Sequence, residues 1–228
     1  MSALLKIAHR GFTKFFPENT LQAFKSSVDH NFDAVELDIQ FSKDRQAMVF
    51  HDENLGRLTG NFAELNDLTL PQLKELKIDR KFSIPTFAEA LEVLNANMLV
   101  VVEIKNPKAV AEVVNQIEKS VNERNWNYNQ FIISAFDWTV LSQVALLNYQ
   151  IMLGVLTYNE LNNAMAFAEK IKANCIFPHF SLLNVEICKE IIQKRIKIYP
   201  WTVNKSDDIQ RMKTLKINGI ISDFPQNI

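Results

Sequence analysis

The chain has 228 residues, of which 47% are hydrophobic, and its formal net charge at pH 7 is −1. This near-neutral balance gives no electrostatic reason to expect nucleic acid or an anionic membrane as a partner. No apolar run approaches the roughly 20 residues of a transmembrane segment, and the run before His9 is too short for a signal peptide. We therefore expect a cytoplasmic protein, with Cys175 and Cys188 as reduced, buried thiols.

Apolar segments with the character of strands alternate with segments of helical periodicity along most of the chain. The run at 99–105 is almost continuously apolar, which is typical of a parallel strand buried on both faces. Strands are expected to begin at residues 4, 34, 99, 131, 151, 174, 197 and 219. Helices are expected near 21–28, 86–95, 108–124, 138–147, 160–172, 183–194 and 206–216.

Eight strand–helix units in about 230 residues predict an α/β fold, a TIM (β/α)8 barrel that forms a single domain over residues 1–228. An open doubly wound sheet is the alternative architecture. No Gly-rich dinucleotide motif and no P-loop supports that alternative in this sequence. The barrel is therefore the expected fold.

An extra hairpin arm interrupts the alternation after the second strand. Residues 33–41 and 46–50 have strand character, and the polar turn between them is too short for a parallel crossover. If the turn centres on Asp44-Arg45, His51 lies opposite Asp38. The returning arm stands outside the count of eight strands. Residues 53–85 are less regular and predict a small insertion beside the barrel, with one short helix near 70–76.

Polar residues collect where the expected strands end, which is the face that carries the active site in such barrels. Each of these residues could have a purely structural role. A lone histidine is usually structural, for example, as we expect for His30 and His179. Lys105 could simply neutralise Glu103, and Trp201 could belong to the core. Their concentration on one rim favours a functional site. The residues concerned are His9, Arg10, Glu36, Asp38, His51, Glu103, Lys105, Trp201, Asn204 and Asp223.

The residue types at this rim suit phosphodiester cleavage. Three carboxylates at one focus favour a hard divalent cation, Mg²⁺ or Ca²⁺, whereas the lack of a close His/Cys ligand set argues against structural zinc. Arg10 and Lys105 could hold a phosphate. Two histidines could move protons while the cation neutralises charge on the phosphoryl oxygens.

In chain order, the motifs resemble those of the glycerophosphodiester phosphodiesterase family, over nearly the whole chain. Arg45 departs from the family pattern, since a glycine often occupies that place in the hairpin turn. The strongest matches are His9-Arg10-Gly11, Pro17-Glu18-Asn19-Thr20, Glu36-Leu37-Asp38, His51-Asp52 and Glu103-Ile104-Lys105. Weaker matches are Ser134-Ala135-Phe136-Asp137, Trp201-Thr202-Val203-Asn204 and Gly219-Ile220-Ile221-Ser222-Asp223-Phe224-Pro225.

The resemblance implies a TIM barrel that hydrolyses a small-molecule glycerophosphodiester to glycerol 3-phosphate and an alcohol. It further implies that a glycerol hydroxyl attacks the phosphorus and that water opens the resulting cyclic phosphate. The insertion at 53–85 would cap the site. By position, the general acid/base pair is His9 and His51, the ligands of one divalent cation are Glu36, Asp38 and Glu103, and the substrate-binding residues are Arg10, Lys105 and Trp201.

Two alternatives remain at the level of sequence. A related barrel phosphodiesterase acting on lysophospholipids could share the same catalytic rim. A non-catalytic barrel that binds phosphorylated ligands would be expected to lack a histidine or a metal-binding acid, and none is missing here. The sequence indicates no transmembrane segment, no nucleic-acid partner and no particular oligomeric state.

Overall fold

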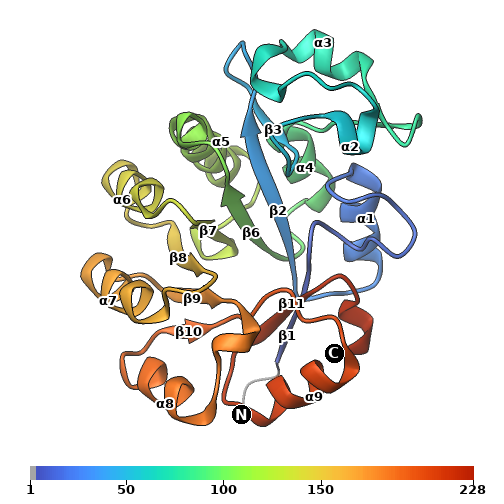
Figure 1. Cartoon of the computed structure of the whole chain (residues 1–228). Coiled ribbons are helices and arrows are strands. Elements are labelled where there is room, and N and C mark those ends of the chain that lie inside the picture. The colour runs from blue at the N-terminus through green and yellow to red at the C-terminus, as the bar shows by residue number, and fades with distance from the viewer. Residues whose placement is uncertain (1–3) are drawn as a thin grey trace.

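The computed structural model describes residues 4–228, and its centre is a barrel of parallel strands surrounded by helices (Figure 1). Around the barrel the strands follow the order β10-β9-β8-β7-β6-β2-β1-β11. The first strand pairs with the last, and backbone hydrogen bonds join β10 and β11 at the two ends of this order, so the sheet curls into a barrel; this confirms the predicted fold and rules out the open sheet. The strands are β1 (Leu5–Ala8), β2 (Ala34–Phe41), β6 (Leu99–Ile104), β7 (Phe131–Ala135), β8 (Met152–Thr157), β9 (Cys175–Pro178), β10 (Lys197–Ile198) and β11 (Gly219–Ser222).

The barrel closes at a seam between β10 and β11 through separate backbone hydrogen bonds. The expected strand at 197–203 forms a regular ladder with β9 only at Lys197–Ile198, because Pro178 of β9 has no N–H to donate. Beyond that point, the N–H of Ile221 donates to the Pro200 carbonyl over 3.0 Å, and the N–H of Val203 donates to the Ile221 carbonyl over 2.9 Å. The barrel is therefore nearly closed, with one irregular seam.

Helices pack on the outside of the barrel and create a second hydrophobic layer there. Along β2, Val35, Leu37 and Ile39 point outward into this layer, so the intervening Glu36 and Asp38 point inward. Within residues 4–228 no helix is both long and apolar enough to cross a bilayer. The helices are α1 (Leu21–Asp29), α4 (Phe87–Leu94), α5 (Val110–Glu123), α6 (Trp138–Leu147), α7 (Leu161–Ile171), α8 (Val185–Gln193) and α9 (Ser206–Thr214). Short 3-10 helices lie at Leu65–Asp67, Pro107–Ala109, Tyr128–Gln130, Phe180–Leu182 and Pro225–Asn227.

The hairpin forms as predicted, but its register differs by one residue. Strand β3 (Ala47–Val49) runs antiparallel to β2 with Val49 opposite Ile39, and the N–H of Phe50 donates to the Asp38 carbonyl over 3.0 Å. Phe50, not His51, therefore lies opposite Asp38, and the predicted pairing is wrong. The cause is a three-residue loop in which Arg45 adopts the left-handed conformation with φ 65°, adding one residue to the turn.

The insertion packs against the far half of the hairpin and has a small core of its own. It contains α2 (Gly56–Thr59), α3 (Leu70–Glu75) and the two short strands β4 (Lys77–Ile78) and β5 (Phe82–Ser83). In Figure 1 it lies at the top, beyond the end of β2. Its core is made of Met48 and Phe50 from the hairpin arm together with Leu55, Leu65, Leu73, Ile78 and Ile84. The hairpin thus joins the barrel to the insertion.

Candidate active site

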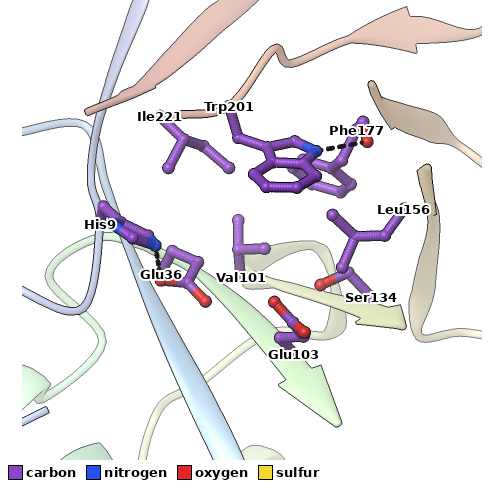
Figure 2. A pocket seen from close by; sticks show the side chains of 9 residues that line it. All are labelled: His9, Glu36, Val101, Glu103, Ser134, Leu156, Phe177, Trp201 and Ile221. Carbon is purple, nitrogen blue, oxygen red and sulfur yellow. Dashed lines mark hydrogen bonds and ion pairs between the residues drawn. The ribbon is translucent and has the colours of Figure 1, made fainter. Parts of the chain in front are cut away.

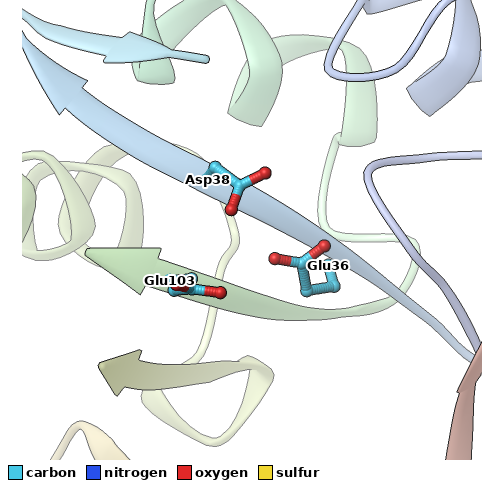
Figure 3. A group of neighbouring side chains, drawn as sticks. All are labelled: Glu36, Asp38 and Glu103. Carbon is cyan, nitrogen blue, oxygen red and sulfur yellow. The ribbon is translucent and has the colours of Figure 1, made fainter. Parts of the chain in front are cut away.

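Three buried carboxylates lie together at the mouth of the barrel (Figure 3). Glu36 and Asp38 occupy alternate inward positions of β2, and Glu103 of β6 is directly in register with Asp38. One oxygen atom from each carboxylate lies within 4.8 Å of the others. The residues are 4%, 1% and 9% exposed, so the cluster is largely removed from water. The predicted metal ligands are therefore brought together in space.

Burial and mutual repulsion make this cluster costly without a cation. Burial, followed by the neighbouring charge of Asp38, raises the pKa of Glu36 to about 8 and moves the pKa of Glu103 upward as well. Oε1 of Glu36 is buried and has no hydrogen-bond partner among residues 4–228. An unsatisfied carboxylate oxygen beside two further carboxylates is the donor set that a hard divalent cation prefers, so these residues fit such an ion.

Two basic side chains lie against the carboxylates. Nζ of Lys105 is 3.2 Å from Oδ1 of Asp38 and 2.5 Å from Oε1 of Glu103. Nε of Arg10 is 3.3 Å from Oδ2 of Asp38, and its backbone N–H donates to Oε2 of Glu36 over 2.9 Å. Burial opposes ionisation of Asp38, but the charges of Lys105 and Arg10 outweigh it and lower the pKa of that carboxyl. The structural pairing considered for Lys105 is thus present, and binding of phosphate by these two residues stays a prediction.

Each of the two predicted catalytic histidines is paired with a carboxylate through Nδ1. Nδ1 of His9 is 2.6 Å from Oδ1 of Asp223, and Nδ1 of His51 is 2.6 Å from Oδ1 of Asp52. When Nδ1 carries the proton, Nε2 is left to accept or donate one, and Nε2 of His9 lies 4.0 Å from Glu36. Each imidazole is therefore held in a fixed orientation through its Nδ1 contact.

The surroundings displace the pKa values of the two histidines in opposite directions. Burial disfavours the charged form of His9, but the hydrogen bond with Asp223 and the charge of Glu36 outweigh it, so its pKa is raised. Burial lowers the pKa of His51, and the opposing charge of Asp38 only partly compensates. The effect of Asp38 on His51 also places this histidine beside the carboxylate cluster.

A set of supporting polar residues holds the site together. Asn19 is fully buried, adopts φ 56°, and donates from Nδ2 to Oδ2 of Asp38 over 2.8 Å. Asn is among the residues that tolerate this backbone conformation, which explains its place in the turn after β1. Asn204 donates from Nδ2 to Oδ2 of Asp223 over 2.6 Å. Asn19 thus holds Asp38 of the carboxylate cluster directly, whereas Asn204 holds Asp223, which in turn holds His9.

Arg57 of the insertion connects two separate parts of the site. Its guanidinium donates to Oδ2 of Asp52 over 2.6 Å and to Oε1 of Glu18 over 2.7 Å. Glu18 also accepts from Nη1 of Arg10 over 2.7 Å. A continuous chain of charged contacts therefore runs from His51 through Asp52, Arg57 and Glu18 to Arg10.

A pocket opens beside the carboxylates, and one of its sides is apolar (Figure 2). Trp201 is only partly buried and donates from Nε1 to the Phe177 carbonyl over 2.8 Å, so it lines the pocket instead of belonging wholly to the core. His30 packs on Phe12 away from the pocket, as expected of a structural histidine. The pocket is lined by His9, Glu36, Val101, Glu103, Ser134, Leu156, Phe177, Trp201 and Ile221.

The residues singled out from the sequence, Asn204 and Asp223 included, gather at this end of the barrel, but the sequence did not show which of them pair with one another. Asp52 stood in a recognised motif directly after His51, and its contact with that ring was not predicted. Glu18 and Asn19 stood in a recognised motif without a role. Arg57 carried no signal, because only the fold of the insertion brings it to Glu18.

Comparison with known proteins gives a consistent result. A model described as the Glycerophosphoryl diester phosphodiesterase family matches residues 9–227. A glycerophosphodiester phosphodiesterase of Caldanaerobacter subterraneus subsp. tengcongensis is 32% identical over 233 residues, covering 98% of this chain and 96% of that protein. One from Bacillus altitudinis is 31% identical and covers 96% of this chain and 94% of that protein.

Solved structures give the same result for the fold. A glycerophosphodiester phosphodiesterase from Thermotoga maritima superimposes with a TM-score of 0.84 at 28% identity, covering 99% of this chain and 97% of that one. A phosphodiesterase from Oleispira antarctica, solved with the product sn-glycerol-3-phosphate, has a TM-score of 0.90 at 24% identity, covering 99% and 95%. At 24% identity, the similarity to the Oleispira antarctica structure establishes the shared barrel fold alone.

Proposed function

The chain belongs to the glycerophosphoryl diester phosphodiesterase family, and from this premise we propose that it hydrolyses glycerophosphodiesters to glycerol 3-phosphate and an alcohol. The observation that carries the proposal is a cluster of three buried carboxylates, two of which line one pocket together with His9, itself paired with Asp223. A second histidine–carboxylate pair, His51 with Asp52, stands at the same cluster. Carboxylates for a cation and two oriented imidazoles are what phosphodiester hydrolysis requires.

Glu36, Asp38 and Glu103 would hold one divalent cation, Mg²⁺ or Ca²⁺. Their oxygen-only donor set and the unpartnered Oε1 of Glu36 support this assignment. When bound, the cation would supply charge neutralisation at the phosphoryl oxygens. Lys105 and Arg10 would bind the phosphate, since both are anchored to Asp38 at the edge of the cluster.

His9 and His51 would transfer the protons. A glycerol hydroxyl attacks the phosphorus and gives its proton to one imidazole, while the other protonates the departing alcohol. Water then opens the cyclic phosphate with the proton transfers reversed, which leaves glycerol 3-phosphate and both imidazoles in their starting states. The Nδ1 contacts with Asp223 and Asp52 support this role, because they leave Nε2 of each ring for the substrate.

The direct test is turnover of a panel of diesters by the purified protein, with release of glycerol 3-phosphate as the measurement. We expect hydrolysis of glycerophosphocholine or glycerophosphoethanolamine in Mg²⁺ or Ca²⁺, loss of activity in EDTA, and recovery when the cation is restored. Full activity in metal-free protein would contradict the cation site. A lysophospholipid in the same panel separates the related activity, and failure to hydrolyse any diester would refute the proposed function.

A further inference from the structure

The rim of the barrel is divided into two halves of different charge. The loops that follow β1 and β6 carry Arg10, Lys14, Lys105 and Lys108. By contrast, the loops after β7, β8, β9 and β10, at 136–137, 158–160, 179–184 and 199–205, contain a single basic residue, Lys205, which directly precedes α9. They carry two exposed carboxylates, Asp137 and Glu160. A bound phosphate would favour the first half, and a positively charged group would favour the second.

The second half is also where aromatic rings gather. Phe136 and Tyr158 follow β7 and β8 directly and are 45% and 60% exposed, although large apolar side chains are usually covered. The ring centroids of Phe136 and Tyr158 lie 5.4 Å and 6.2 Å from that of Trp201, which lines the pocket beside Glu103. His179 completes the group, with its centroid 4.8 Å from that of Tyr158.

The geometry of these rings suits a cation. The interplanar angles are 79° between Phe136 and Trp201 and 47° between Tyr158 and Trp201, so these pairs are not stacked. Because Phe136 and Tyr158 are also partly exposed, part of each ring remains open to solvent and to a ligand. A quaternary ammonium group binds to the π-faces of such rings, and it cannot be held by a conventional hydrogen bond because it has no N–H. His179 adds no competing charge, since burial lowers its pKa.

We propose that Phe136, Tyr158 and Trp201 form a subsite for a quaternary ammonium head group, so that the preferred substrates are choline-type glycerophosphodiesters. This inference rests on the proposed function, because it assigns the alcohol side of the same pocket. A zwitterionic diester matches the divided rim, with its phosphate toward Arg10 and Lys105 and its trimethylammonium toward the aromatic rings. An apolar head group would gain from the rings but not from Asp137 and Glu160.

The test compares glycerophosphocholine with its neutral isostere, in which a 3,3-dimethylbutyl group replaces choline. The two diesters have nearly the same shape and differ in the charge of the head group. We expect kcat/KM to be about tenfold higher for the cationic diester, as summed cation–π contacts to three partly exposed rings imply. The preference should lie in KM, because the head group lies away from the proton-transfer residues.

Variants at the exposed rings assign the preference to the subsite. Tyr158→Leu and Phe136→Leu each keep apolar bulk but remove a π-face, so each should lower the preference about threefold. Tyr158→Phe keeps the ring and should retain it. Tyr149→Leu is the matched control, because Tyr149 is 89% exposed and lies beyond the C-terminal end of α6, whereas the site lies at the opposite end of that helix.

A binding measurement separates this inference from the proposed function. The affinities of both intact diesters for the His51→Ala variant are measured by calorimetry, and we expect about tenfold tighter binding of the cationic diester. Equal affinities, or a preference that Tyr158→Leu and Phe136→Leu leave unchanged, would overturn the subsite. If neither diester is hydrolysed by the native chain, the proposed function fails, while the ratio of affinities still decides the subsite.

Discussion

At the scale of single residues, the pairing of each histidine with an acid defines what the site can do. Asp223 accepts from Nδ1 of His9 at 2.6 Å and is itself held by Asn204. Asp52 has the same relation to His51. An imidazole fixed through Nδ1 presents Nε2 in a defined direction, so we expect these two acids to position the imidazoles.

Removal of either imidazole should therefore abolish most turnover without unfolding the chain. We expect His9→Ala and His51→Ala each to lower kcat by ~10²–10⁴-fold, the usual contribution of general acid–base catalysis. Asp223→Asn should lower kcat by ~10–100-fold, because it leaves His9 in place but disturbs its tautomer and orientation. Steady-state kinetics with melting temperatures for each variant are the measurement. Near-native kcat in both alanine variants would exclude this pair as the proton-transfer groups.

The backbone of Arg45 is strained, and the only sign of this in the sequence is that Arg45 stands where the family often has glycine. Its φ of 65° is left-handed, which costs a residue with a Cβ about 1–2 kcal/mol relative to the usual helix region. Arg45→Gly should therefore raise the free energy of unfolding by about 0.5–1 kcal/mol in urea titrations. Lys43→Gly in the same loop is the control: Lys43 is not left-handed, so glycine there should destabilise the fold. A destabilised Arg45→Gly variant would contradict the strain.

The sequence indicated the chemistry-bearing residues but could not supply all of the geometry between them. Glu36 and Asp38 were placed on one face by the alternation of a strand, and this holds. Whether Asp38 lies opposite His51 across the hairpin depends on the length of the turn, and one left-handed residue in that turn shifts the pairing by one residue. Contacts across the fold, such as Arg57 with Glu18, have no local pattern that could reveal them.

At the scale of elements, apolar patterns predicted the barrel strands and helices well because each must bury a defined face. Helix α6 begins and ends where its periodicity indicated, at Trp138 and Leu147. The expected strand at 197–203 was too long, since Pro178 of the neighbouring strand interrupts the ladder. Strands β4 and β5 have only two residues each, too few to produce an alternation that a sequence pattern can show.

The insertion is joined to the site through Arg57, whose loss should affect both activity and acid stability. Burial opposes ionisation of Asp52, but its bonds with Arg57 and His51 outweigh this and lower its pKa to about 2. A carboxyl with a folded pKa below its unfolded value of about 3.9 stabilises the fold above that value, and the contribution disappears as pH falls toward 2. Glu18 has a lowered pKa too, with Arg57 and Arg10 outweighing its burial.

We therefore expect Arg57→Met to lose less stability than the native chain between pH 5 and pH 3, measured as free energy of unfolding in urea. The same variant should lower kcat by about tenfold, because Asp52 no longer holds His51 as firmly. Arg57→Lys keeps the charge but cannot contact Asp52 and Glu18 with one planar guanidinium, so its kcat should lie between those of Arg57→Met and the native chain. An Arg57→Met variant with native kcat and an unchanged pH profile would show that the insertion is attached independently of this contact.

At the scale of the whole molecule, the carboxylate cluster should make the metal-free protein less stable than the cation-bound one. Glu36 and Asp38 come from β2 and Glu103 from β6, so a bound cation ties two strands together. Saturating Mg²⁺ or Ca²⁺ should raise the melting temperature in one cooperative transition, with about 2.7 kcal/mol of stabilisation when the concentration is a hundred times Kd.

Glu36→Gln provides the matching variant for this prediction. It removes a buried carboxyl whose raised pKa makes burial costly at neutral pH, so the metal-free variant should be more stable than the native chain by about 1 kcal/mol while its cation-dependent shift disappears. Glu92→Gln alters an exposed carboxylate on α4 and should change neither quantity. A thermal shift that survives in Glu36→Gln would place the cation elsewhere.

The backbone at the irregular seam between β10 and β11 can adjust more easily than the backbone of the regularly paired strands. Counting around the sheet, β2 and β6 stand near the middle of the strand order, whereas Trp201 follows Pro200 at the seam itself. Small backbone adjustments at the seam could therefore move Trp201 without displacing Glu36, Asp38 and Glu103. The contact between Asn204 and Asp223, which holds His9, crosses the same seam, so evolutionary drift there is free only as long as that contact is preserved.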